Sequence, residues 1–189
     1  MQDDIILYYD FEENHVTVKN YNEFVKNKDK DKLAEFVYNR LYSRYVKPFE
    51  FEDKKYKNGF SMMASFCLLI ETLQSFKEGL GDSNGKSGEL FQQFFNEEAN
   101  FKEFKKTLFY KHVRCGILHQ GETTGGWKIN RKPNTPLVND KDINANKFMK
   151  ELKKSLKKYG SDLKAAEWDS EIWDNFRTKM RKIIKNTEG

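Results

Sequence analysis

The sequence predicts a mainly α-helical fold, with a short β-hairpin at the N-terminus and a small β insertion in the second half. Apolar residues recur at helical spacing through most of the chain, whereas alternating apolar and polar residues are confined to short runs. A hydrophobic content of 38% beside a charged content of 33% is typical of a soluble globular protein. The 189 residues include sixteen phenylalanines and nine tyrosines, which is enough bulky material for one compact domain with a sizeable core.

The N-terminal region, residues 1–57, is expected to supply the hairpin and a first helix, both packed on the rest of the domain. Two short β-like runs, Ile5–Tyr9 and His15–Val18, predict the hairpin. The charged stretch Lys26–Lys32 is expected to interrupt the start of the helix, and Pro48 ends it. The helix itself is indicated by apolar residues near helical spacing: Phe24, Leu33, Phe36, Val37, Leu41 and Tyr45.

Residues 58–189 are expected to form a helical bundle. Its helices are predicted at about residues 58–79, 89–95, 100–120, 144–159 and 168–185. Alternation around Trp127–Ile129 predicts a short strand or hairpin, and the prolines that follow it mark a loop. The 100–120 helix is expected to bury one apolar stripe, made of Phe101, Phe104, Leu108 and Cys115.

Charge is divided unevenly along the chain. Residues 1–100 hold 13 Lys and Arg against 18 Asp and Glu, a net charge of −5, whereas residues 101–189 hold 21 against 11, a net charge of +10. A basic half favours a polyanionic partner such as RNA or DNA. A surface that only keeps the protein soluble has the same composition, so that alternative stays open.

Targeting signals and cysteine usage bear on the compartment. Nothing at Met1 resembles a secretion signal, and we expect no run of about eighteen apolar residues that spans a bilayer. Cys67 and Cys115 lie in apolar helical patterns, which favours two reduced thiols over a disulfide. Together these observations predict a cytoplasmic protein with no membrane partner.

The combination of Arg114 and His119 near the end of the 100–120 helix is the strongest chemical feature of the chain. Arginine supplies a permanent charge and forked hydrogen bonds for a phosphate, and histidine moves protons near neutral pH, so the pair suits phosphodiester chemistry. Five residues on a straight helix turn the second side chain by about 140° from the first, so we expect the two to converge only when a second copy pairs with the first. The alternative is a surface arginine and a histidine stabilised by the helix dipole before the Gly121 cap.

Further candidates accompany this pair. Glu71 in the 58–79 helix is expected either to pair with Arg114 or to reach solvent, because a buried carboxylate needs a partner. Tyr110 lies one helical turn before Arg114 and is expected either to contact a base or phosphate or to pack. Weaker candidates for nucleic-acid contacts are the basic residues Lys111, Lys128, Arg131 and Lys132.

Two other patterns are excluded by their spacing. Gly81–Ser87 is similar to a phosphate-binding loop, but three residues separate its glycines where four are needed, and a helix precedes it rather than a strand. His112 and His119 lie about 10.5 Å apart along a helix, too far to share one zinc ion with Cys115, so we expect no metal and no cofactor. A nucleophile pair of Cys115 and His119 stays open as an alternative.

The block Phe109–Glu122, whose core is an arginine followed after four residues by a histidine, resembles the R-x4–6-H signature of the HEPN (higher eukaryotes and prokaryotes nucleotide-binding) superfamily. Gly59–Leu73 and Thr124–Ile129 are similar to a prokaryotic branch of it, so the resemblance covers about residues 58–186. It implies that 58–189 is a HEPN-like helical bundle, that two copies dimerise through the motif helices, and that the activity is often that of a metal-independent endoribonuclease.

The resemblance implies that Arg114 and His119 of both protomers cleave RNA by attack of the ribose 2′-hydroxyl, which leaves a 2′,3′-cyclic phosphate. Family members commonly serve as toxins or as effectors in anti-phage and stress defence, so an antitoxin or another defence protein is an expected partner. Many active members carry Asn, Asp or His directly after the arginine, where this chain has Cys115. The alternative is a catalytically inactive HEPN module that binds RNA, nucleotide or a partner protein.

Overall fold

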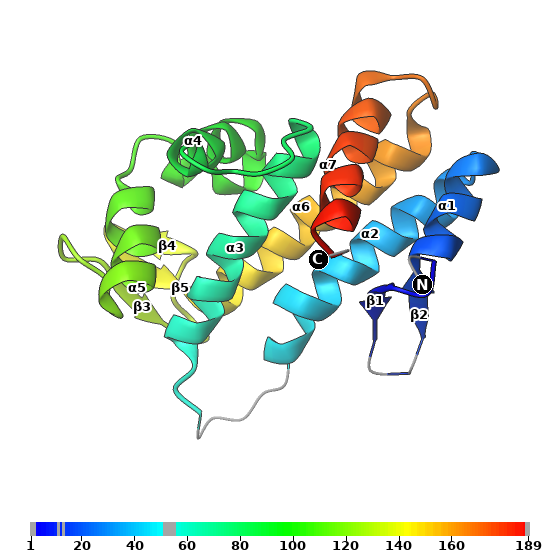
Figure 1. Cartoon of the computed structure of the whole chain (residues 1–189). Coiled ribbons are helices and arrows are strands. Elements are labelled where there is room, and N and C mark those ends of the chain that lie inside the picture. Colours follow the sequence, from blue (N-terminus) through cyan, green and yellow to red (C-terminus); the bar gives the residue numbers. More distant parts are fainter. Residues whose placement is uncertain (1–2, 11, 13, 51–55, 188–189) are drawn as a thin grey trace.

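The computed structural model describes residues 3–10, 12, 14–50 and 56–187 and shows a mainly α-helical protein (Figure 1). The predicted fold class is confirmed in this general form, since helices dominate and two small sheets accompany them. The predicted regions at both ends of the chain include some positions that lie outside the described residues: 1–2, 11, 13, 51–55 and 188–189.

The N-terminal hairpin is confirmed. Strands β1 (Ile6–Tyr9) and β2 (His15–Thr17) pair in antiparallel fashion. Thr17 also caps the next helix, because its hydroxyl accepts a hydrogen bond from the backbone N–H of Asn20 at 3.2 Å. Leu7 of the hairpin is buried in the same hydrophobic core as the helices, so the hairpin packs on them.

The predicted first helix is two helices, α1 (Val18–Lys26) and α2 (Lys30–Tyr45), which separate inside the charged stretch as predicted. Lys28 adopts a left-handed backbone with φ 52°. Asp29 then caps α2, since its carboxylate accepts a hydrogen bond from the backbone N–H three residues on at 3.0 Å. The chain leaves α2 through the short 3-10 helix η1 (Lys47–Phe49), which contains the proline expected to end the helix.

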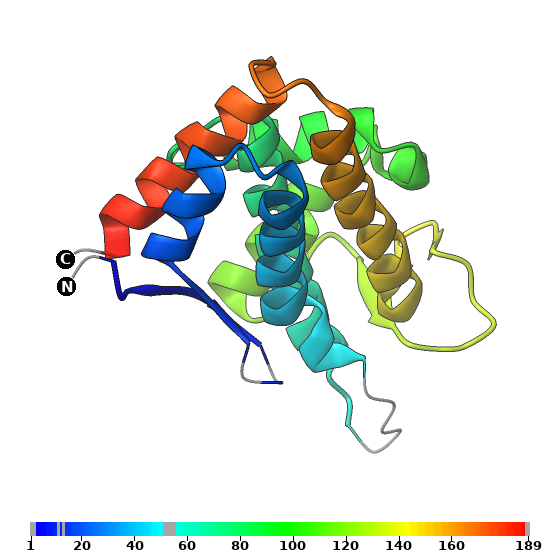
Figure 2. The same ribbon diagram turned by 90° about the vertical axis from the view of Figure 1, so that its right-hand side faces the viewer.

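Helix α3 (Gly59–Lys77) lies at the centre of the fold. It packs against α2 and against α4 (Ser87–Glu97), α6 (Ala145–Ala165) and α7 (Glu171–Thr187), and Figures 1 and 2 show these helices around it. Four of the predicted helices are thereby confirmed. The side chains of α3 are buried on most sides, notably Met62, Met63, Phe66, Cys67, Leu69, Ile70, Leu73 and Phe76.

By length and composition alone, α3 is also apolar enough to cross a membrane, and it is the one such helix in the described part of the chain. The expectation that no such run exists was therefore wrong. Of its apolar window, 56% is buried inside the protein. A core helix that is surrounded by other helices needs apolar side chains on most faces, which gives it the same composition as a membrane span.

The predicted continuous helix over residues 100–120 is wrong. The chain instead forms a 3-10 helix, η2 (Ala99–Phe104), then a turn, a π-helical turn, η3 (Tyr110–Arg114), and the short helix α5 (Cys115–Gln120). In the π-helical turn the N–H of residue 115 bonds to the carbonyl of residue 110, one residue further back than in an α-helix. The Arg114 side chain therefore leaves a widened turn.

Local features explain the break. Phe101 departs from helical geometry, with φ −118° and ψ 19°. Thr107 closes the turn after η2, because its hydroxyl and its backbone N–H both donate to the carbonyl of Phe104, at 2.9 Å and 3.1 Å. The expected apolar stripe is lost with the helix, and Leu108 is 61% exposed.

Phe109, the residue just before η3, is anchored in a cluster of aromatic rings. Its ring centre lies 5.2 Å from that of Phe95, 5.4 Å from that of Phe104 and 5.7 Å from that of Phe148. Trp127, which follows the motif in the sequence, also contacts Phe109, with 6.1 Å between the ring centres. Because Phe109 is fully buried, this cluster fixes the start of the segment that carries Arg114.

A three-stranded sheet follows the motif. Strand β3 (Lys128–Asn130) confirms the strand predicted there, and it pairs in parallel with β5 (Asp142–Asn144). The other edge of β5 pairs in antiparallel fashion with β4 (Val138–Asn139). Sequence reasoning did not find β4 and β5, because polar strands of two or three residues are too short to show alternation.

Gly116, in α5, is required by close packing. A Cβ at this position would lie 2.5 Å from the carbonyl oxygen of Glu122, in the turn that follows the helix. Alanine ordinarily stabilises a helix by about 0.5–1 kcal/mol relative to glycine. Here we expect Gly116→Ala to lower the free energy of unfolding by about 2 kcal/mol, because backbone must move to make room. Denaturant unfolding of the two proteins measures the difference.

Gly160→Ala in α6 is the matched control. Gly160 is also buried and helical, but the nearest atom to its added Cβ is the carbonyl oxygen of Ala34 at 3.9 Å, an ordinary contact. We expect this variant to raise the free energy of unfolding by about 0.5–1 kcal/mol. A neutral or stabilising effect of Gly116→Ala would contradict the close approach.

Candidate active site

Glu71 and Arg114 form an ion pair between α3 and η3. Arg114 Nη2 donates a hydrogen bond to Glu71 Oε2 at 3.1 Å, and the two side chains are only 15% and 13% exposed. The predicted pairing is therefore confirmed, and the alternative in which Glu71 reaches solvent is excluded. A charge that is largely removed from water needs an opposite charge, so each side chain holds the other in place.

His119 contacts Arg114 within the same chain, with Arg114 Nη1 3.4 Å from His119 Nε2. The expectation that the two side chains converge only across a dimer was wrong, because it considered only their directions around the helix axis. Helical side chains lean towards the N-terminus, so the imidazole of His119 reaches back along α5 towards the guanidinium. One chain thus brings the arginine and the histidine together.

The contact with Arg114 assigns a role to one nitrogen of His119. A guanidinium carries only donors, so a hydrogen bond from Arg114 requires His119 Nε2 to be the acceptor. His119 Nε2 thus lies beside a fixed positive charge. The imidazole is exposed, whereas Arg114 is mostly covered, so the proton acceptor is accessible and the cation is held.

The π-helical turn places Tyr110 and Cys115 against Arg114. The guanidinium carbon lies 5.5 Å from the centre of the Tyr110 ring, a cation–π arrangement. Burial raises the pKa of Tyr110, and a hydrogen bond between its side chain and that of Cys115 raises it further. Cys115 thus interacts with Tyr110 and Arg114, and the nucleophile pair of Cys115 and His119 stays an alternative.

Two serines that sequence reasoning did not select complete the surroundings of Glu71. Ser83 Oγ donates to Glu71 Oε1 at 2.5 Å, and Ser87 Oγ donates to the same oxygen at 2.8 Å. Both belong to the run Gly81–Ser87, whose glycine spacing excludes a phosphate loop. Its small polar residues signal a hydrogen-bonding segment, but nothing in the sequence shows that their acceptor lies on α3.

These contacts keep both members of the ion pair charged. Burial disfavours the Glu71 carboxylate, but hydrogen bonds from Ser83, Ser87 and Arg114, together with the arginine charge, outweigh it and lower the pKa of Glu71. Burial also disfavours the Arg114 cation, but the hydrogen bond and charge of Glu71 raise its pKa. A fixed cation beside a proton-accepting imidazole can bind a phosphate and move a proton.

Helix α7 holds the loop that carries the two serines. Lys179 Nζ donates to the carbonyl of Gly81 at 3.1 Å, and burial lowers the pKa of Lys179. Asn175 Nδ2 donates to the carbonyl of Lys77, at the end of α3, at 2.6 Å. The position of Glu71 therefore depends on a helix more than fifty residues after the motif.

The predicted nucleic-acid-binding residues divide into two groups. Arg131 is engaged in the fold, because its Nε donates to Asn146 Oδ1 at 3.0 Å. Its Nη1 donates to the carbonyl of Tyr56 at 3.1 Å and to the side chain of Asn58. This guanidinium ties the start of α3 to α6 instead of forming an exposed basic surface. The residues that remain exposed are Lys111, Lys128 and Lys132.

The described part of the chain offers no set of side chains that could bind a metal ion. No group of three His, Cys, Asp or Glu side chains there is arranged to hold an ion. His112, which precedes Cys115 and His119 in the sequence, pairs its Nδ1 with Thr124 Oγ1 at 2.8 Å. This contact joins η3 to the turn after α5.

Comparisons with known proteins give no match. No protein-family model matches the chain, and neither does any curated protein or solved structure. The relationship to the HEPN superfamily therefore stays a resemblance, and the function has to be argued from the site itself.

Glu71→Gln should destabilise the protein in a pH-dependent way. Because the pKa of Glu71 is lowered in the native state, its contribution is complete above the ordinary value of 4.5 and is lost as the pH falls through the native value. At neutral pH we expect the variant to be less stable by about 1–3 kcal/mol, since Arg114 keeps only a neutral partner. Denaturant unfolding at a series of pH values measures this difference, which should shrink in acid.

Glu89→Gln is the matched control, because Glu89 is exposed on α4. The free energy of unfolding of this variant should stay within about 0.5 kcal/mol of wild type at each pH. A stability difference between Glu71→Gln and wild type that does not change with pH would show that the charge of the carboxylate is irrelevant.

Proposed function

We propose that the protein is a metal-independent endoribonuclease that cleaves RNA in the cytoplasm through Arg114 and His119. The observation that carries this proposal is the contact between a held guanidinium and an exposed imidazole, with Arg114 Nη1 3.4 Å from His119 Nε2. It combines phosphate recognition and a proton acceptor in one place. The HEPN resemblance and the net charge of +10 on residues 101–189 support RNA as the substrate.

In the proposed reaction an RNA phosphate binds alongside the contacting side chains of Arg114 and His119. Arg114 donates hydrogen bonds to the non-bridging phosphoryl oxygens, and His119 Nε2 accepts the proton of the ribose 2′-hydroxyl. The 2′-oxygen forms a bond to phosphorus while the bond to the 5′-oxygen breaks, and the leaving oxygen takes up a proton. The products are a 2′,3′-cyclic phosphate and a 5′-hydroxyl. DNA lacks the nucleophile and is not cleaved.

A second copy of the chain is proposed to complete the site. Leu68 on α3 and Leu118 on α5 are 44% and 38% exposed, and they lie close in sequence to Glu71 and His119. Large exposed apolar side chains beside a site favour an interface. A two-fold pairing brings two copies of His119 to one cleft, where one accepts the hydroxyl proton and the other supplies a proton to the leaving oxygen.

The role that we propose is that of a toxin or an effector in anti-phage or stress defence, restrained by an antitoxin or another defence protein. This part rests on the HEPN resemblance. A second candidate function is a catalytically inactive module that binds RNA, nucleotide or a partner protein. It is favoured by Cys115, which occupies the position where active family members carry Asn, Asp or His.

Cleavage of RNA in the presence of EDTA tests the proposed activity. Purified protein should convert single-stranded RNA to fragments with 2′,3′-cyclic phosphate and 5′-hydroxyl ends, identified by mass spectrometry. His119→Ala should slow cleavage by about 10²–10⁴-fold, the usual effect of losing a general base. Arg114→Ala should slow it by about 10²–10³-fold, because a donor to the phosphoryl oxygens is lost.

His15→Ala and Arg181→Ala are the matched controls. Both residues are exposed, and neither contacts the site. They should cleave at the wild-type rate. Equal cleavage by Arg114→Ala, His119→Ala and wild type would point to a contaminating nuclease, and loss of cleavage in EDTA would refute metal independence. Binding of RNA without any cleavage would favour the inactive module.

Leu68→Glu and Leu118→Glu test the dimer. Each places a charge at the proposed interface, so we expect a monomer by size-exclusion chromatography with light scattering, and at least a tenfold slower cleavage. Tyr9→Glu is the control, because Tyr9 is exposed on β1, on the opposite side of the molecule from α5 (Figure 1). A wild-type monomer that cleaves RNA would remove the second copy from the mechanism.

A further inference from the structure

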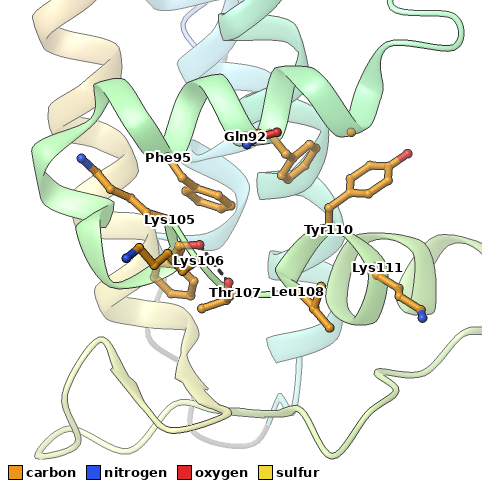
Figure 3. Close-up of a pocket in the computed structure, with 11 residues that line it drawn as sticks. Gln92, Phe95, Lys105, Lys106, Thr107, Leu108, Tyr110 and Lys111 are labelled. Carbon is orange, nitrogen blue, oxygen red and sulfur yellow. Dashed lines mark hydrogen bonds between the residues drawn. The ribbon is translucent and has the colours of Figure 1, made fainter.

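A groove of about 350 Å³ adjoins the candidate active site (Figure 3). It lies between α4 and the segment Phe104–Lys111, which leads from η2 into η3. Tyr110 belongs to both places, since its side chain lines the groove and the guanidinium of Arg114 lies 5.5 Å from the centre of its ring. A ligand held at Arg114 can therefore continue into the groove.

The lining of this groove is basic. Of its eleven lining residues, three are lysines and none is acidic: the lysines are Lys105, Lys106 and Lys111. All three are exposed, and none forms an ion pair with a carboxylate of the described residues. Their charge is available to an anionic ligand. Several lysines of α6 differ in this respect, since carboxylates pair with Lys153, Lys154 and Lys158.

The groove also offers surfaces for a nucleobase. Gln92 is exposed on α4, and its amide carries both donors and an acceptor for the edge of a base. Leu108 is exposed in the lining of the groove, and Tyr110, whose ring centre lies 5.4 Å from that of Phe91, adds a partly exposed aromatic side chain. Figure 3 shows two of the lysines at one end and Tyr110 at the other, with Leu108 between them.

We propose that this groove binds the single-stranded RNA that flanks the scissile phosphate. Its lysines contact backbone phosphates, while Gln92, Leu108 and Tyr110 contact a base. The volume lies at the lower end of the range of about 300–1,000 Å³ for ligand pockets, which suits about one nucleotide. A single strand fits because its bases are free to leave the stack. The inference rests on the proposed function, which makes RNA the ligand of Arg114.

Fluorescence anisotropy with a labelled single-stranded RNA whose 2′-hydroxyls are methylated measures binding without cleavage. Lys105→Gln/Lys106→Gln should weaken binding on the order of tenfold at low salt, because two phosphate contacts are lost. The plot of log affinity against log salt concentration should become shallower by about 1.4, since each phosphate contact of a single strand contributes about 0.7.

Lys19→Gln/Lys26→Gln is the matched control. It removes the same charge from exposed positions on α1, at the opposite side of the molecule from α4 and α5 (Figure 1), and should leave both affinity and slope unchanged. Circular dichroism and thermal unfolding establish that both double variants are folded, as expected for exposed lysines. Equal affinities of the two double variants overturn the proposal, and so does the absence of binding by the wild-type protein.

The binding experiment and the cleavage experiment can fail independently of each other. If the groove variant loses affinity for the methylated RNA while wild type leaves unmodified RNA intact, the groove is an RNA site and the nuclease proposal fails. If unmodified RNA is cleaved but the groove and control variants bind the methylated RNA equally, the nuclease proposal survives and the groove proposal fails.

Discussion

The burial of Phe109 connects the candidate site to the hydrophobic core. Its ring packs against rings from α4, η2 and α6 and against the tryptophan before β3, so it cannot move without disturbing several elements at once. Truncation of a buried phenylalanine typically costs about 3–5 kcal/mol, which is a large part of the stability of a domain. The adjoining π-helical turn therefore starts from a fixed point, and the direction of Arg114 is set from there.

The ion pair between Glu71 and Arg114 contributes differently to the protein from the hydrophobic core beside it, which stabilises the fold. The free energy needed to remove two charges from water offsets most of the attraction between them, so such a pair contributes little net stability. Two serine hydroxyls and an aromatic ring are nevertheless committed to it. We infer that these contacts serve to orient the guanidinium of Arg114 rather than to stabilise the fold. The buried contacts of Glu98, with Lys77 at 2.6 Å and Ser155 at 2.7 Å, are structural by comparison, since they join α3 and α6 at the end of α4.

Sequence patterns succeed in this chain where local periodicity reflects burial. They predict the hairpin, the break before α2 and the helices around α3. They fail over residues 100–120, because Phe101, Phe104 and Phe109 lie near helical spacing but are buried by separate tertiary contacts across a kink. The pairing of Glu71 follows from the requirement that a buried carboxylate has a partner. Its two serines lie 12 and 16 residues away and meet it only because α7 sets the path of their loop, which no local pattern records.

The π-helical turn has a consequence for how this segment tolerates changes in length. Such a turn is an α-helical turn that contains one additional residue. A chain that lacks one residue between Tyr110 and Arg114 can close into ordinary α-helical winding, while the ring of Phe109 and the packing of Gly116 against Glu122 stay in place. The number of residues between the core phenylalanine and the arginine is therefore free to differ by one among chains with this arrangement. The four residues between Arg114 and His119 cannot lose one in the same way, because they lie in the ordinary α-helix α5, which contains no widened turn to absorb a deletion.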